Sequence, residues 1–327
     1  METLPKRRSI RRIAKKHSLK VLNQYLRQGK LFFLLLKYAF LSVVAFVFLY
    51  PFLYMAITSF KSPSDLFNSM VNWVPRELYF RNYVRAFDML GIPRHLLISI
   101  GITLTSIVLR CLICSFIGYG FARYNFPGKK FWFAIVILTI IIPTQTIQLP
   151  QYLEFNALGW VGTYLPILIP QLFGYGLRGG LFIFLFRQFF LNMPKSLEEA
   201  ARIDGCGFFK IFFRIALPAV RTSTVVCAVL AMVWHWNDYS EISIYVTNPA
   251  QWPITARLPV IYNEYLTFFG NAGSMNNMVR PEMLTSELVT EGTVMAATVM
   301  VILPVLIAYM ILQKQFVQGI ERSGLVE

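Results

Sequence analysis

Six long apolar stretches constrain the fold more than any other feature of this sequence. They cover residues 38–60, 96–121, 131–149, 164–189, 222–243 and 292–313. A helix needs about 20 apolar residues to cross the hydrocarbon core of a bilayer, and its backbone groups must be hydrogen-bonded internally there. The alternating pattern of a membrane β-barrel is not present. The sequence therefore predicts an all-α integral membrane protein with six transmembrane helices.

The composition agrees with a membrane protein. Hydrophobic residues make up 56% of the 327 residues and charged residues only 14%, whereas a soluble domain carries about 25% charged residues. Mean hydropathy is +0.54. A soluble chain of this length would form roughly two domains, but the apolar content favours a single membrane bundle.

The positive charge is concentrated at the N-terminus. The chain has a net charge of +15, and residues 1–30 contain ten of the 31 Lys and Arg residues and one acid, Glu2. Blocks of like charge are typically disordered tails that contact anionic partners. A nucleic-acid arm and a juxtamembrane segment on anionic lipid are both compatible with this pattern. The apolar run that begins at Leu31 favours the lipid, so no nucleic-acid partner is expected.

The charges between the apolar stretches predict the orientation, because cytoplasmic links carry an excess of Lys and Arg. The 122–130 link has three bases and no acid, and the 187–221 link has six bases and three acids. The 238–291 link instead has two bases and six acids. We expect both termini and the two basic links in the cytoplasm. The chain then divides into a basic tail, 1–30, and a transmembrane domain, 31–327, with an extended outer loop at 244–291.

The cytoplasmic link contains a pattern for two short helices, at residues 194–218. Ser196 and Glu199 have the spacing of a capping box, and Gly205 can end the helix in a left-handed conformation. A second helix would carry four phenylalanines on one face; these are Phe208, Phe209, Phe212 and Phe213. The hairpin could rest in the membrane interface with Glu198 and Glu199 solvated, or it could dock a cytoplasmic protein.

This hairpin resembles the EAA signature of permease subunits of binding-protein-dependent ABC importers. The residues at the family's spacing are Glu199, Ala200, Ala201, Gly205, Ile215, Leu217 and Pro218, and Asp204 is also usual at its position. The resemblance implies that residues 194–218 form the coupling helix that sits in a cleft of the ATP-hydrolysing subunit. It also implies that Glu199 pairs with a basic group there and that Gly205 sets the turn.

Other stretches are similar to the maltose-type, carbohydrate-uptake class of these permeases. They are 119–128 after the second span, Pro143 to Pro150 with Gln145 and Gln148, Trp236-Asn237-Asp238, and 316–320. The last five residues, 323–327, depart from the class, and so does the long basic N-terminus. The resemblance implies the type I ABC importer permease fold and import of a sugar or oligosaccharide across the bacterial cytoplasmic membrane. A polyamine or a glycerol-phosphate-like solute is the alternative.

The same resemblance implies the partners. They are a second, different permease subunit in a heterodimer, two cytoplasmic ATP-binding subunits, an extracytoplasmic solute-binding protein and the lipid bilayer. ATP and Mg²⁺ would be bound by the ATPase, so no cofactor is expected in this chain.

A membrane-embedded enzyme is disfavoured, because the sequence has no P-loop, no H-E-x-x-H and no G-x-S-x-G. A channel would not explain the hairpin. Cys111 and Cys114 form a C-x-x-C without a second pair, so we expect two small apolar residues and no metal site.

Two arginines lie inside predicted spans, Arg110 and Arg178. An arginine at the bilayer centre costs about 2.5–3.5 kcal/mol on insertion scales, so each needs a partner. Each could bond helix carbonyls or face another subunit, or each could line a pathway that favours anionic solutes such as uronate oligosaccharides. Four glycines surround Arg178 and predict a broken helix; they are Gly174, Gly176, Gly179 and Gly180.

Two sets of residues are candidates for contacts with the solute and the binding protein. The solute-pathway candidates are Arg110, Gln145, Gln148, Arg178, Trp236 and Asn237. Trp236 and Asn237 also fit an interfacial aromatic belt with a helix cap. The outer loop holds Trp252, Tyr262 and Tyr265, and in maltose-type relatives the corresponding loop reaches toward the binding protein. The alternative is a loop that packs on the subunit's own outer surface.

Overall fold

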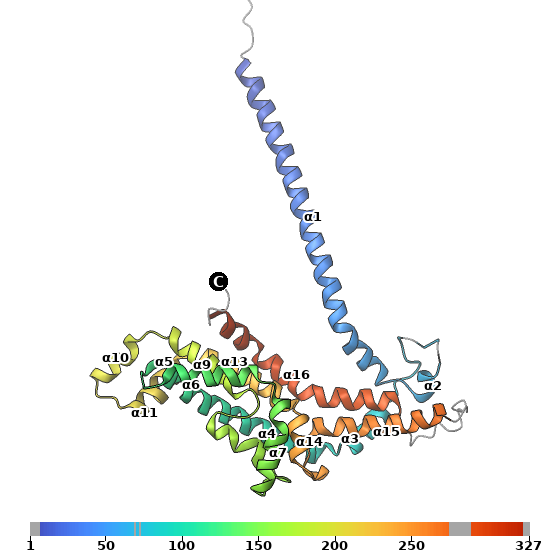
Figure 1. Ribbon diagram of the computed structural model, residues 1–327. Coiled ribbons are helices and arrows are strands. Elements are labelled where there is room, and N and C mark those ends of the chain that lie inside the picture. The colour runs from blue at the N-terminus through green and yellow to red at the C-terminus, as the bar shows by residue number, and fades with distance from the viewer. Residues whose placement is uncertain (1–6, 69, 72, 275–288, 323–327) are drawn as a thin grey trace, which may run out of the picture. The chain divides into compact units, whose positions relative to one another are not determined.

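The computed structural model describes residues 7–322 except 69, 72 and 275–288, and every regular element in that part of the chain is a helix (Figure 1). Contacts divide the chain into two units, residues 1–57 and 58–327.

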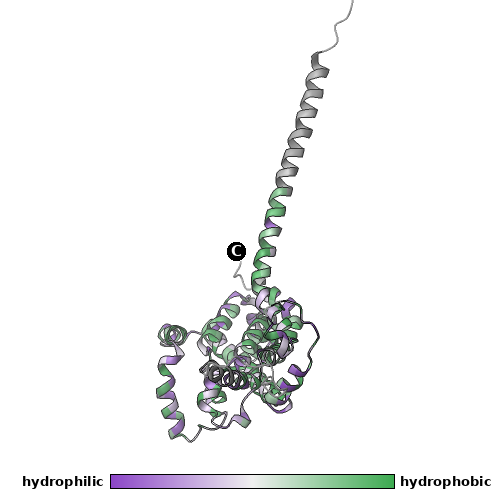
Figure 2. Ribbon diagram, turned by 90° about the vertical axis from the view of Figure 1, so that its right-hand side faces the viewer, coloured by the Kyte–Doolittle hydropathy of each residue, from purple (hydrophilic) through white to green (hydrophobic). Residues whose placement is uncertain are grey.

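The first unit is a single helix, α1 (Arg7–Thr58), which ends one residue inside the second unit. Its apolar part, Phe32–Thr58, is long enough to cross a membrane and is mainly green in Figure 2. The span begins six residues earlier than the predicted start at residue 38. The basic segment is helical from Arg7 onward, because lysine, arginine and leucine propagate a helix well and no proline lies between Arg7 and Lys30.

The second unit is built from helices of very different lengths. In chain order they are α2 (Pro63–Leu66), α3 (Arg81–Leu90), α4 (Ile92–Leu109), the π-helical turn η1 (Arg110–Cys114), α5 (Ser115–Arg123), α6 (Lys129–Ile141), α7 (Thr144–Ala157), α8 (Leu165–Leu168), the 3-10 turn η2 (Pro170–Phe173), α9 (Gly179–Asn192), α10 (Ser196–Ile203), α11 (Phe208–Ile211), the π-helical turn η3 (Phe212–Ala216), α12 (Leu217–Ala219), α13 (Arg221–Trp236), α14 (Ser240–Tyr245), the 3-10 turn η4 (Pro249–Gln251), α15 (Ile254–Ser274) and α16 (Glu291–Arg322).

Fewer than six of these segments are continuous apolar helices of spanning length. Within the described residues three qualify, Phe32–Thr58, Ile92–Arg123 and Glu291–Gly319. Two bent pairs raise the number to five; they are α6 with α7, bent by 102°, and Phe208–Ala219 with α13, bent by 80°. α9 is apolar but has only 14 residues. The described chain therefore has three to five candidate spans.

The predicted span 131–149 is wrong as one straight helix. α6 ends at Ile141, and Ile142 has an extended backbone with ψ 122°. Pro143 follows, and a proline disfavours the helical conformation of the residue before it. The chain becomes more polar past this point, and the helix axis turns away in α7.

The other spans differ from the prediction at their ends. The expected break in 164–189 is confirmed, because α9 begins only at Gly179 after the short elements α8 and η2. Span 222–243 is shorter than predicted, since α13 ends at Trp236. The described part of the outer segment, 244–291, contains two helical elements, η4 and α15. α15 buries Ile254 and Ile261 against α3, α4 and α16.

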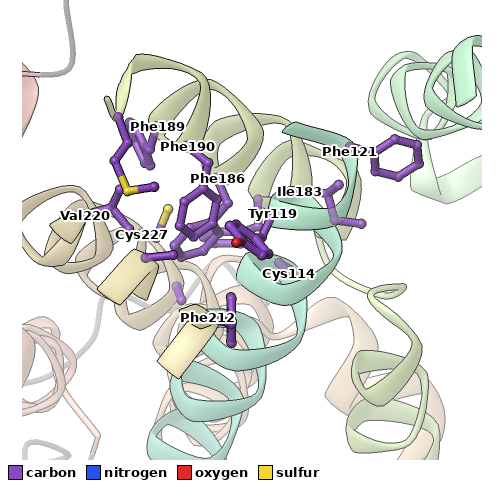
Figure 3. Close-up of a cluster of buried hydrophobic side chains, with 14 residues drawn as sticks. Cys114, Tyr119, Phe121, Ile183, Phe186, Phe189, Phe190, Phe212, Val220 and Cys227 are labelled. Carbon is purple, nitrogen blue, oxygen red and sulfur yellow. The ribbon is translucent and has the colours of Figure 1, made fainter. Parts of the chain in front are cut away.

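An aromatic cluster forms the core between α5, α9, η3 and α13 (Figure 3). Its buried members are Cys114, Tyr119, Phe121, Phe182, Ile183, Phe186, Phe189, Phe190, Met193, Phe212, Ala216, Val220, Cys227 and Ala231. The Tyr119 ring centroid lies 5.1 Å from that of Phe190 and 5.3 Å from that of Phe212. Phe212 belongs to the hairpin, so the hairpin and the spans share one core.

The close approach of α5 and α9 depends on Gly118. A Cβ there would lie 2.8 Å from the Phe186 Cβ and 2.9 Å from the Arg187 backbone nitrogen, so Gly118→Ala would force the helices apart. Overpacking typically costs about 1–3 kcal/mol. We expect a lower midpoint of thermal unfolding for the purified subunit in detergent. Gly120→Ala is the matched control, because its Cβ would meet open space; equal effects of the two variants would contradict this packing.

Candidate functional site

The hairpin 194–218 begins with α10, which starts at Ser196 as predicted. The predicted capping box is wrong. Lys195 occupies the N-cap with helical dihedral angles and makes no side-chain cap hydrogen bond. Its carbonyl accepts the backbone N–H groups of Glu198 and Glu199. Ser196 therefore lies inside the first turn, too late in the helix to act as its cap.

The turn after α10 has the geometry that the sequence predicts. Gly205 has a φ of +78°, in the left-handed region that favours glycine. The Cys206 N–H donates to the Ala201 carbonyl at 2.9 Å, and the Gly205 N–H donates to the Arg202 carbonyl at 3.0 Å. This pair of bonds is a Schellman motif. It ends α10 at a fixed point and reverses the chain toward α11.

α10 has one buried face and one exposed face. Ala201 is 5% exposed and Glu198 3% exposed, and residues three apart share a helix face. The exposed face carries the other residues of the signature together with an apolar side chain; they are Glu199, Ala200, Ile203 and Asp204. Ile203 is 86% exposed. This face therefore leaves one apolar side chain and two carboxylates accessible.

Glu198 is buried, so the alternative in which Glu198 and Glu199 are both solvated is wrong for Glu198. Its Oε1 lies 2.7 Å from Arg123 Nε, and both side chains are nearly fully buried. Its Oε2 lies 3.6 Å from the Nη2 of Arg202, one turn later. The Arg123 guanidinium also donates to the Met193 carbonyl. The residue in the sequence that could have indicated burial of Glu198 is Arg123, which lies just after the predicted span 96–121.

The four phenylalanines do not share one face. Phe208 and Phe212 turn inward, with ring centroids 5.9 Å and 5.3 Å from that of Tyr119. Phe209 and Phe213 are 64% and 51% exposed. Consecutive helical residues point about 100° apart, so only the i, i+4 partners stay together.

The end of the hairpin leads into α13. Ile215 and Leu217 are half-buried and Pro218 is exposed. α12 ends at Ala219, one residue after Pro218, and the axis then bends by 80° before α13 begins.

Arg178 lies at the broken helix and has an unusual backbone. Its φ of 54° makes it the one non-glycine residue with a positive φ among those that the structure describes. It caps α9, its side chain is exposed, and its guanidinium lies 4.8 Å from the Trp234 ring centroid. Left-handed backbone at a bulky residue is strained and gathers at functional sites.

Arg110 is fully buried beside the same break. Its Nη1 donates to the Tyr175 carbonyl at 2.8 Å, and its guanidinium lies 5.9 Å from the Phe182 ring centroid. It bonds a backbone carbonyl, which is one of the three roles expected for it. The bond satisfies a group that the broken helix leaves free.

The six solute-pathway candidates fall into separate groups. Gln148 donates to the Ser240 hydroxyl at 3.0 Å, which links α7 to α14, and Gln145 is exposed on α7. Trp236 is 5% exposed and donates to the Val301 carbonyl at 3.2 Å. Asn237 is exposed and donates to the carbonyl of Val233. Trp236 thus packs against α16.

The aromatic residues of the outer segment are only partly accessible. Trp252 is half-buried and donates to the Val246 carbonyl at 2.7 Å. Tyr262 is 49% exposed, and its ring stacks on that of Tyr265 with centroids 6.2 Å apart. Burial, with the Glu291 carboxylate as the second cause, raises the pKa of Tyr265 above its usual value. Tyr262 therefore presents the more accessible of the two rings.

No cluster of three or more His, Cys, Asp or Glu side chains suited to a metal ion occurs within the described part of the chain. Two features are candidate binding sites. The exposed face of α10 could bind a partner protein, and the broken helix at Arg178 could bind a ligand.

Known proteins resemble this chain along most of its length. An arabinooligosaccharides transport system permease protein of Halalkalibacterium halodurans is 27% identical over 86% of this chain and 93% of its own length. A polygalacturonan/rhamnogalacturonan transport system permease protein of Bacillus subtilis is 28% identical over 89% and 97%. A subunit of a bacterial ABC transporter involved in the import of the acidic polysaccharide alginate has the same fold. It gives a TM-score of 0.71 with 24% identity, over 87% of this chain and 96% of that one.

Residues 114–322 match the family model described as the binding-protein-dependent transport system inner membrane component. This match covers the hairpin, the broken helix and the outer segment. A system of this kind implies a solute-binding protein and an ATPase as partners. Because the match covers more than half of the chain, the protein belongs to this family and is a non-catalytic, multi-pass subunit of the inner membrane without a cofactor of its own.

Proposed function

We propose that this chain is one of two different permease subunits of an ATP-driven ABC importer that moves an oligosaccharide carrying carboxylates across the bacterial cytoplasmic membrane. The observation that carries the proposal is α10, which ends in a Schellman turn and exposes Glu199, Ala200, Ile203 and Asp204 on one face. An isolated membrane bundle has no use for an exposed face of this kind. A cytoplasmic partner that supplies energy would bind to it.

The proposed subunit crosses the membrane six times. The crossings are the apolar part of α1, Ile92–Arg123, α6, α9, α13 and α16. At 1.5 Å per residue α9 is about 21 Å long, shorter than the ~30 Å of a bilayer core, so α8 and η2 complete that crossing. A Cβ at Gly319 would touch Val226 and Thr222. The end of α16 therefore lies beside the start of α13, which supports a cytoplasmic C-terminus at the hairpin end.

α10 is the proposed coupling helix. Binding of ATP and Mg²⁺ closes two ATPase subunits, and their clefts carry the two hairpins of the permease pair together. The spans then change from inward-facing to outward-facing, and the binding protein releases its solute. Such coupling requires contacts that differ between the two states. Glu199, Ala200, Ala201, Asp204 and Gly205 lie at the hairpin tip, and Ile215, Leu217 and Pro218 join it to the spans.

Arg178 supports a solute with carboxylates. It is an exposed cation in a strained backbone at a helix break, and broken helices in transporters commonly form solute sites. Two of the similar proteins transport acidic polysaccharides by their descriptions, alginate and polygalacturonan. A glycerol-phosphate-like anion remains the second candidate. A polyamine is disfavoured, because its charge would be repelled.

The outer face of α15 is the proposed contact for the binding protein. Tyr262 is 49% exposed there and Val260 38% exposed, whereas Tyr265 and Trp252 are half-buried. This assignment places the docking site beside α3 and α16, which α15 contacts.

Arg178→Gln tests the solute class. In the full transporter reconstituted in vesicles, uptake of a trigalacturonate should fall about tenfold, the effect of 1.4 kcal/mol, while uptake of a neutral arabinotriose should not change. Arg178→Gly is the companion variant. It removes the charge and suits the positive φ, so it should lower acidic uptake and raise the unfolding midpoint. Equal losses for both solutes, or a wild-type importer that carries only the neutral one, would refute the acidic solute.

A further inference from the structure

One buried side chain ties three parts of the cytoplasmic end together. Arg123 is the last residue of α5, and its Nε lies 2.7 Å from Glu198 Oε1 in the first turn of α10. Its Nη2 donates to the carbonyl of Met193, the residue that caps α9. The Arg123 side chain is 3% exposed and that of Glu198 4% exposed. The pair therefore lies inside the protein, between the spans and the hairpin.

The hairpin has two arms, and they are attached to the spans in different ways. The second arm, α11 with η3, is held by aromatic packing of Phe208 and Phe212 on Tyr119. The first arm, α10, buries only Glu198 and the small Ala201. Because α10 buries so little apolar surface, the Arg123–Glu198 ion pair supplies much of its attachment to the spans. The orientation of α10 therefore depends on the Arg123–Glu198 pair.

A buried ion pair contributes little net stability to the attachment of a helix. Desolvation of the two charges offsets much of their attraction, and an apolar pair of similar volume is often as stable or more stable. The best-attested use of such a pair is to fix geometry. The geometry at issue is the direction of Glu199, the next residue, which lies on the exposed face of the same helix turn.

We propose that Arg123 and Glu198 are positioning residues for energy coupling: their ion pair locks α10 to the cytoplasmic end of the span Ile92–Arg123, so that a force on the exposed face moves the span. This inference rests on the proposed coupling function of α10. Without the pair, α10 would be able to rotate about the turns at its two ends. Closure of the ATPase would then move α10 without moving the span.

The test uses the complete transporter, with its second permease, ATPase and binding protein, in lipid nanodiscs and in vesicles. Glu198→Gln is nearly isosteric. The variant should assemble in normal amount and hydrolyse ATP, but the number of ATP molecules consumed per solute imported should rise at least tenfold. The reversed pair, Arg123→Glu with Glu198→Arg, should restore that ratio to within about threefold of wild type. Lys130→Gln is the matched control, because it removes an exposed positive charge from the same end and leaves the pair intact.

A second variant keeps the test decisive if Glu198→Gln prevents the transporter from assembling. If Glu198→Gln lowers the amount of complex, Arg123→Met with Glu198→Leu replaces both charges with apolar groups and avoids a lone buried charge. It should assemble and still be uncoupled. A normal ratio of ATP to solute in either assembled variant would overturn the proposal, and so would transport and hydrolysis that fall in equal proportion.

The failure of this inference can be told from the failure of the proposed function. If Glu199→Ala is uncoupled and Glu198→Gln is normal, α10 docks the ATPase but the ion pair does not position it. If Glu199→Ala is itself normal, the docking assignment fails first.

Discussion

Replacing Glu199 with alanine is expected to abolish solute-dependent ATP hydrolysis and import while the subunit remains folded. Glu199 is exposed on α10 and contributes nothing to the buried face of Glu198 and Ala201, so its removal leaves the hairpin core intact. In the docked complex its carboxylate is expected to be buried against a basic group of the ATPase. Removal of one partner of such an interfacial charge pair costs about 2–5 kcal/mol, which weakens docking by roughly 30-fold or more.

The measurement is ATP hydrolysis by the reconstituted transporter with and without loaded binding protein, together with the unfolding midpoint of the complex. Glu154→Ala is the control, since it removes an exposed glutamate from α7, away from the hairpin. We expect normal stimulation with Glu154→Ala and none with Glu199→Ala. Normal stimulation in both would show that α10 is not the coupling helix.

The sequence predicts well those features that depend on one residue's backbone. Gly205 takes the left-handed conformation that ends α10, and the glycines around Arg178 mark the real break before α9. In both cases the turn requires a conformation that most side chains resist, so a glycine in the right place is sufficient for the prediction.

The sequence predicts less well which side chains of a helix are buried against another element. Glu198 and Glu199 are chemically identical neighbours, yet one is buried and the other exposed. Which of them turns inward depends on the position of Arg123, in a distant part of the chain. The phenylalanines of the second arm show the same limit, because Phe212 enters the core and Phe213 does not. A helical period gives relative directions, and only the tertiary contact selects the buried one.

Apolar content also overestimates the length of straight spans. Residues 131–149 were apolar enough to predict one span, but Pro143 separates α6 from α7 and the axes diverge by 102°. Hydropathy also gave no sign of α15, which lies in the outer segment. Hydropathy reports the solvent a segment prefers, whereas proline and tertiary packing decide where its axis points.

Gly179→Ala is expected to disrupt the broken helix more severely than a glycine-to-alanine substitution at any other position in this region. A Cβ at Gly179 would overlap the Gly174 carbonyl oxygen and lie 2.8 Å from Arg110 Nη1. Neither group can yield easily. The carbonyl is main chain at a turn with φ +74°, and the guanidinium is fully buried and bonded to the Tyr175 carbonyl.

The loss should therefore exceed the usual cost of overpacking, about 1–3 kcal/mol. Displacing Arg110 would break a charged hydrogen bond, worth about 1.5–3 kcal/mol, and leave its charge in an apolar setting. We expect little folded subunit in the membrane and a strongly lowered unfolding midpoint. Gly101→Ala is the matched control, because it lies in α4 with open space around its Cβ. If both alanines are tolerated equally, Arg110 does not hold the break closed, and a role for it in contact with solute becomes the better explanation.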